Sequence, residues 1–140
     1  YRAGLQNFLE RQDFYKVFVL GGSMIDVRLA GCSVVGDVWE GLDGPDDDRA
    51  YPEELVEKVK GKMLLIHPVN NHNSPCYPPV SALRFMDALQ QANKDFDMLM
   101  LPGNNSSYGT YVTRRIWDYF IEHLAQEKPP ENVKLDVTMI

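Results

Sequence analysis

The chain has 140 residues, of which 44% are hydrophobic and 24% are charged, so it can form one globular domain with its own core. Its net charge of −6 argues against nucleic acid or an anionic membrane surface as the partner. No apolar run approaches the roughly 20 residues of a membrane-spanning helix. The two cysteines, Cys32 and Cys76, are too few for a disulfide scaffold, and they form one disulfide or remain free thiols.

Helical and strand patterns alternate along most of the chain. The spacing of apolar residues, together with the Gly and Pro residues between them, defines each segment. The predicted elements are a helix over 1–12, a strand over 16–20, a helix over 52–60, a strand over 61–68, a helix over 82–92, a strand over 96–101, a helix over 110–124 and an extended tail over 131–140. Alternation of this kind favours a parallel sheet with helices on both faces.

The helix over 52–60 carries signals at both ends. Pro52 stands in the first position, where its missing N–H costs nothing, and acidic residues follow it. Lys58 and Lys60 would lie in the last turn and complement the helix dipole, and Gly61 would cap the carboxyl end.

The stretch from Gly61 to Pro68 organises the chain. Its four consecutive apolar residues, bounded by Gly and Pro, predict a strand that is buried on both faces. A polar loop rich in turn-forming residues follows over 69–75. Ligands and catalytic groups of parallel α/β sheets lie just past the carboxyl ends of the strands. The loop after Ile66 is therefore the first candidate for a functional site.

Several segments together resemble the prolyl oligopeptidase family of serine peptidases, and its dipeptidyl peptidase IV branch in particular. They are GKMLLIH at 61–67, SALRFMDAL at 81–89, ANKDFDMLMLPG at 92–103 and TRRIWDYF at 113–120. The resemblance implies the C-terminal half of an α/β-hydrolase fold, with a parallel sheet flanked by helices on both faces. It also implies a peptide as substrate or ligand.

The resemblance further implies that residues 1–140 are the C-terminal part of one catalytic domain. The nucleophile elbow of such a domain, Gly-x-Ser-x-Gly, does not occur in the sequence and would precede Tyr1 together with the earlier strands. The strand over 16–20 would then lack a neighbour on one side. We expect Leu5, Phe8 and Leu9 of the first helix to be partly exposed for the same reason.

The acid position of the family's triad falls on an amide. Counted from His67, the family's acid corresponds to Asn71, and His72 follows it. Asn73 matches the residue with which the family holds a substrate carbonyl. Asn in place of the acid favours the wrong imidazole tautomer of a catalytic His.

The base position of the triad falls on a hydroxyl. The family's Pro-Gly-x-Asn-His-Gly motif corresponds to PGNNSS at 102–107, which places Ser106 where the family has its His. A Ser hydroxyl cannot accept and return a proton near neutral pH. His72 is a weak substitute for the base, and a solvated loop His is the simpler interpretation.

These two replacements predict a peptidase-like domain that is non-catalytic or severely impaired. The alternative is an active serine exopeptidase that cleaves after proline, with catalytic residues displaced by a shift in loop register or supplied from outside this chain. The resemblance implies that no cofactor is needed. It also implies that the parent polypeptide is extracytoplasmic, either periplasmic, secreted or membrane-anchored. A homodimer is possible.

The remaining candidate residues have simpler interpretations. His67 is expected to be a hydrogen-bonded structural His, and His123 to lie on the surface or at a helix end. No group of His, Cys, Asp and Glu has the spacing of a metal site. Asp46, Asp47 and Asp48 lack the alternating ligands of a calcium loop and are expected to be solvated.

Overall fold

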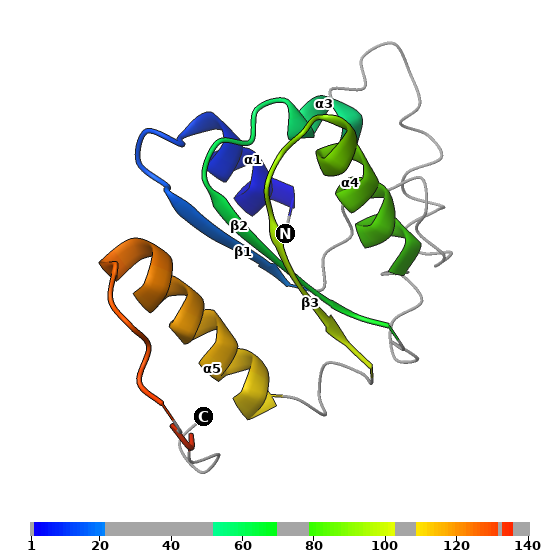
Figure 1. Ribbon diagram of the computed structural model, residues 1–140. Helices are drawn as coiled ribbons and strands as arrows, with labels where there is room; N and C mark the ends of the chain where they lie inside the picture. Colours follow the sequence, from blue (N-terminus) through cyan, green and yellow to red (C-terminus); the bar gives the residue numbers. More distant parts are fainter. Residues whose placement is uncertain (1, 22–51, 70–78, 103–108, 132, 136–140) are drawn as a thin grey trace.

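A computed structural model describes residues 2–21, 52–69, 79–102, 109–131 and 133–135. The helices and strands follow the predicted order (Figure 1). They are α1 (Arg2–Glu10), β1 (Val17–Gly21), α3 (Pro52–Val56), β2 (Lys62–Pro68), α4 (Pro79–Gln91), β3 (Asp97–Leu101), α5 (Gly109–Phe120) and the π turn η4 (Ile121–Ala125). Residues 133–135 of the predicted tail are neither helix nor strand, and 136–140 lie outside the described residues.

The three described strands form a parallel sheet in the order β1-β2-β3, as the alternating pattern predicted. Gly21 at the end of β1 pairs with Ile66, and Pro68 at the end of β2 pairs with Leu101. All three strands therefore end at the same edge, which we call the carboxyl edge. They begin at the opposite, amino edge.

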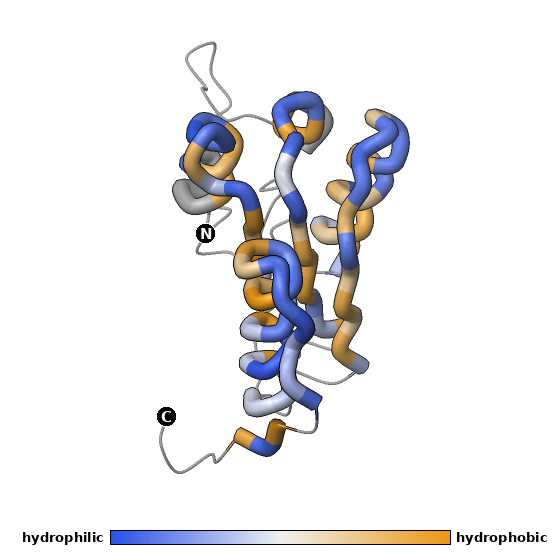
Figure 2. The backbone as a smooth tube through the Cα atoms, turned by 60° about the vertical axis from the view of Figure 1, so that its left-hand side comes forward, coloured by the Kyte–Doolittle hydropathy of each residue, from blue (hydrophilic) through white to orange (hydrophobic). Residues whose placement is uncertain are grey.

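Helices cover both faces of the sheet, as predicted (Figure 1). Met63 and Leu65 of β2 pack in one buried cluster with residues of α1, α3 and α4. Leu64 and Ile66 face the other way and pack in a second cluster with Tyr119 of α5. The central strand is thus buried on both faces, and the hydrophobic colouring of the strands follows from this position (Figure 2).

The first helix is better covered than we expected from the sequence. Leu5, Phe8 and Leu9 are only 3%, 1% and 6% exposed, so the predicted partial exposure is wrong. The Phe8 ring stacks on Phe18 of β1, with centroids 4.7 Å apart. The reason is that α1 shares one apolar cluster with α3 and α4, so its burial does not depend on further strands beyond β1.

The prediction that the helix starting at Pro52 continues to Lys60 is wrong. α3 ends at Val56, and the chain then tightens into turns in which Lys58 and Val59 donate to the carbonyls three residues back. The Lys58 carbonyl and the Lys60 N–H bond to the Gln12 side chain, and Val59 remains in the core at 3% exposure. Lys58 and Lys60 therefore do not lie in the last turn of a helix, and Gly61 is not its cap.

Gln12 joins α1 to the start of β2. Its side-chain oxygen accepts hydrogen bonds from the main-chain N–H groups of Lys60 (2.6 Å) and Gly61 (3.2 Å). Its amide nitrogen donates to the carbonyls of Leu9 (3.1 Å) and Lys58. These bonds fix the turn before β2 against the end of α1.

A glycine is needed at position 61 because the main chain of Lys16 lies too close for a side chain to fit. A Cβ on Gly61 would lie 2.7 Å from the carbonyl oxygen of Lys16, which also accepts the Lys62 N–H at 2.9 Å. Gly61→Ala is expected to lower the free energy of unfolding by about 1–3 kcal/mol, measured by urea denaturation. Gly109→Ala is the control, because a Cβ there meets nothing within 4 Å. Equal effects of the two changes would contradict this explanation.

Candidate active site

The loops predicted to carry the acid and the base leave the sheet side by side. Pro68 pairs with Leu101 at the ends of β2 and β3, and the next N–H, that of Val69, donates to the Leu101 carbonyl at 2.8 Å. This bond continues the ladder one step past the strands. The segments 70–78 and 103–108 therefore start from adjacent points on the carboxyl edge. A triad acid and base must approach each other from two such loops.

The predicted site residues themselves lie outside the described residues. Asn71, His72 and Asn73 fall in 70–78, and Ser106 falls in 103–108. Their roles stay predictions, and so does the alignment that assigns them. Cys32 and Cys76 and the acidic run at 46–48 are also outside the described ranges.

His67 stands at the carboxyl end of β2, directly before the candidate acid loop. Its side chain is 3% exposed, and Nδ1 bonds to the carbonyl of Pro68 at 2.8 Å, so Nδ1 carries the proton. Nε2 is buried and has no hydrogen-bond partner in the part of the chain that the structure describes. The expectation of a hydrogen-bonded His is confirmed. Its structural role is supported by a ring that is almost inaccessible.

Burial lowers the pKa of His67 below its usual value of 6.5, although the bond to Pro68 acts in the opposite direction. The unfolded chain then binds the proton more readily than the folded chain. Stability is complete above pH 6.5 and is lost as the pH falls below it, by up to about 1.4 kcal/mol per pH unit. We expect unfolding free energies to decrease from pH 7.5 to 5.5, and His67→Gln to flatten that slope. An unchanged slope in His67→Gln would assign the effect to another group, and His123→Gln serves as the control.

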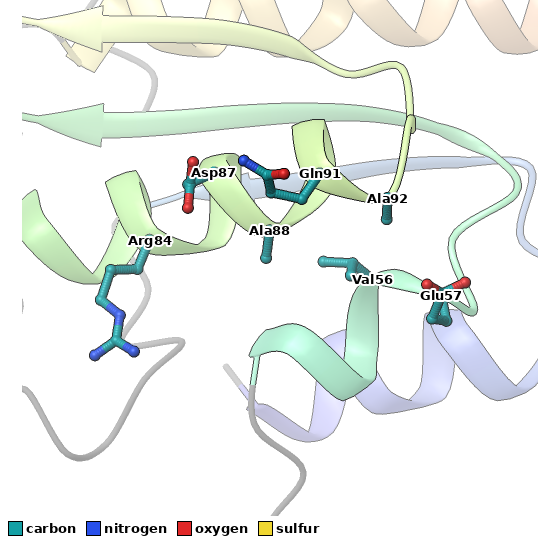
Figure 3. Close-up of a pocket in the computed structure, with 7 residues that line it drawn as sticks. All are labelled: Val56, Glu57, Arg84, Asp87, Ala88, Gln91 and Ala92. Atoms are coloured by element: carbon teal, nitrogen blue, oxygen red, sulfur yellow. The ribbon is translucent and has the colours of Figure 1, made fainter.

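A hollow of about 310 Å³ lies between α3 and α4 (Figure 3). Val56 of α3 and Ala88 of α4 project toward the space between the helices, and Arg84 extends from α4 on the same side as Ala88. Among the described residues, its lining contains no Ser, Cys or His. Its carboxylates, Glu57 and Asp87, are therefore without the Ser or Cys nucleophile and the His base of a peptidase triad in the described lining, and the hollow does not replace the carboxyl edge as the candidate active site.

The described ranges show neither a metal site nor a membrane span. No group of three or more His, Cys, Asp and Glu residues there could hold a metal ion. No helix in those ranges is long and apolar enough to span a membrane. His123, which was expected on the surface or at a helix end, lies in η4. Its ring packs against the ring of Tyr119 in a T-shaped arrangement, with centroids 4.3 Å apart.

The fold is that of part of an α/β-hydrolase domain, as found in peptidases. No protein-family model and no curated protein matches the chain. Among solved structures, it is similar to a protein assigned as a dipeptidyl aminopeptidase IV from Bacteroides ovatus, at 23% identity and a TM-score of 0.71 over 88% of this chain. It is also similar to the acylaminoacyl peptidase of Pyrococcus horikoshii, at 17% identity and a TM-score of 0.62 over 94% of the chain. Dipeptidyl peptidase 4 of Porphyromonas gingivalis matches at 18% identity and a TM-score of 0.60 over 81%.

These neighbours are the kind of protein that the sequence motifs resemble, and the predicted fold is confirmed. The chain spans only 18%, 23% and 17% of the lengths of the three solved proteins. At these identities the likeness establishes the fold. The activity of the whole protein is a matter for proposal.

Proposed function

We propose that residues 1–140 form the C-terminal part of one α/β-hydrolase domain of a dipeptidyl peptidase IV-like protein of the prolyl oligopeptidase family. In this proposal the nucleophile elbow and the earlier strands lie in a preceding part of the same polypeptide. The acid and base positions are occupied by Asn71 and Ser106, so the domain is non-catalytic or severely impaired toward peptides. Asn73 would still be able to hold a peptide carbonyl.

One observation carries the proposal: the Val69–Leu101 bond places the starts of the two loops next to each other at the carboxyl edge. This is where a parallel α/β domain places a triad acid and base. The chain has an amide and a hydroxyl at the two matching positions. Neither group can act as a proton acceptor near neutral pH, so a scaffold suited to the reaction lacks the chemistry for it.

The same resemblance supports an extracytoplasmic location for the parent polypeptide and peptides as its ligands. β1 has no second neighbour among the described strands, so its outer edge can pair with a strand from the preceding part of the polypeptide. A homodimer is compatible with this arrangement.

The test is hydrolysis of X-Pro chromogenic dipeptides by the full polypeptide that contains this segment. We expect no rate above background, because loss of the base alone costs about a million-fold in comparable triads. A turnover rate typical of peptidases would contradict the proposal. It would support the active exopeptidase, with His72 or a residue from outside this chain as the base.

A further inference from the structure

Lysines gather at the amino edge of the sheet, which is opposite to the candidate active site. Lys16 directly precedes β1, Lys60 and Lys62 stand on either side of Gly61 at the start of β2, and Lys94 lies in the turn before β3. Parallel strands begin at one edge, so three separate segments bring these residues together. They line one hollow of about 410 Å³, which we call the amino-edge hollow. The end of α5 reaches the same edge (Figure 1).

The amino-edge hollow is strongly positive in a chain that is acidic as a whole. Its lining has four lysines but one carboxylate, that of Asp95, whereas the net charge of the chain is −6. The side chain of Asn93 and the ring of His123 complete the polar lining. None of the four ammonium groups forms an ion pair with a carboxylate of the described residues.

Two of the four charges are held in place by the main chain. Lys16 Nζ donates to the carbonyl of Gln12 at 2.9 Å, and Lys94 Nζ donates to the carbonyl of Glu57 at 3.2 Å. A carbonyl is uncharged, so it positions an ammonium group without neutralising it. Each of these groups has three N–H donors and keeps two for another partner.

The floor of the hollow is also fixed before any ligand arrives. Gln12 binds the N–H groups of Lys60 and Gly61, and the Lys62 N–H binds the Lys16 carbonyl at 2.9 Å. The hollow is of the size that small-molecule sites have in proteins, about 300–1,000 Å³. The main chain beneath the lysines and two of the four ammonium groups are thus held before an anion binds, which lowers the ordering cost of binding.

We propose that the amino-edge hollow binds a small anion with more than one negative charge, of the phosphate-ester or pyrophosphate class. Such an anion has several oxygen acceptors, and its charge of two or more gains more from a group of lysines than a single charge does. The volume of the hollow favours a small molecule, and the negative net charge of the chain disfavours a nucleic acid. The inference is independent of the peptidase proposal, because the hollow and the candidate active site are at opposite edges of the sheet.

The experiment is calorimetric titration of inorganic pyrophosphate into the protein at constant ionic strength. We expect one saturable site, which is weakened about tenfold or more in the double variant Lys60→Gln/Lys62→Gln. Both side chains are exposed, so the thermal melt is expected to stay unchanged. The control Lys58→Gln/Lys134→Gln removes the same charge from exposed positions outside the hollow, and binding is expected to change by less than about twofold.

Two results would overturn the inference. One is the absence of saturable binding by the unaltered protein, and the other is equal weakening in both double variants, which would mean general attraction by surface charge. If Lys60→Gln/Lys62→Gln lowers the melting temperature, Lys16→Gln replaces it. That variant is expected to weaken binding about threefold, and an unchanged affinity would again contradict the inference.

Discussion

Asn71→Asp combined with Ser106→His is expected to make an unreactive polypeptide react with a fluorophosphonate probe, given a Gly-x-Ser-x-Gly elbow upstream. The double change rebuilds two members of the triad on a scaffold whose two loops already start side by side at the carboxyl edge. The members of a triad act as a unit, so each single change is expected to give little. We expect the double variant to label at least about a hundredfold faster than either single variant.

The control for this rescue shifts the base by one residue. Asn71→Asp with Ser107→His introduces the same groups in the same loops, but the alignment does not place Ser107 at the base position. It is expected to label no faster than Asn71→Asp alone. Equal labelling of the two double variants, or equal gains from either single change, would show that the register of the alignment is wrong.

Phe8→Ala is expected to give the largest loss of stability among the changes considered, about 3–5 kcal/mol. The Phe8 side chain is 1% exposed, stacks on Phe18, and fills the space beside Gly61. Its removal leaves a cavity at the point where α1, β1 and the start of β2 meet. Much of the 5–15 kcal/mol of an ordinary domain would be lost, so the variant is expected to unfold at much lower urea concentration.

Phe14→Ala is the matched control, because Phe14 is 71% exposed and lies in the turn between α1 and β1. The same atoms are removed, and the expected change is within about 0.5 kcal/mol. A small loss in Phe8→Ala would show that α1 is not anchored to the sheet through this ring, and the described packing of the first helix would have to be revised.

The order of elements could be predicted from the sequence because the apolar patterns are strong and well separated. The uninterrupted apolar run of β2 predicted a strand buried on both faces, and its alternate residues do pack against different helices. The pattern of α4 predicted its buried face correctly, since Ala82, Phe85 and Leu89 are all buried. Its start differed by three residues, because Pro79 occupies the first turn, and its end differed by one.

Two features could not be predicted because they depend on contacts between distant segments. α3 ends at Val56, and the turns that follow it bond to the side chain of Gln12, which the charged residues of 52–60 did not indicate. The side-chain bonds of Gln12 join residues 46, 48 and 49 positions apart, which local patterns do not reveal.

The candidate site, like the fold, was predicted only in part. The sequence predicted which edge of the sheet carries it, because the position past a parallel strand is fixed by topology. It did not reveal the Val69–Leu101 bond that places the starts of the two loops together. The sequence does contain a signal for the amino-edge hollow, because a lysine stands shortly before each of the three described strands. This signal predicts a cluster of lysines only if the strands are parallel, so that all three begin at the same edge.

The most direct test of the impaired triad is the intact mass of the unaltered full polypeptide after incubation with a fluorophosphonate probe. The probe reacts only with a Ser that an adjacent base activates, so it reports the charge relay and does not depend on the choice of substrate. With Asn71 and Ser106 at the acid and base positions, we predict no adduct at neutral pH. A stoichiometric adduct on a single Ser would contradict the account and show that a working base lies elsewhere.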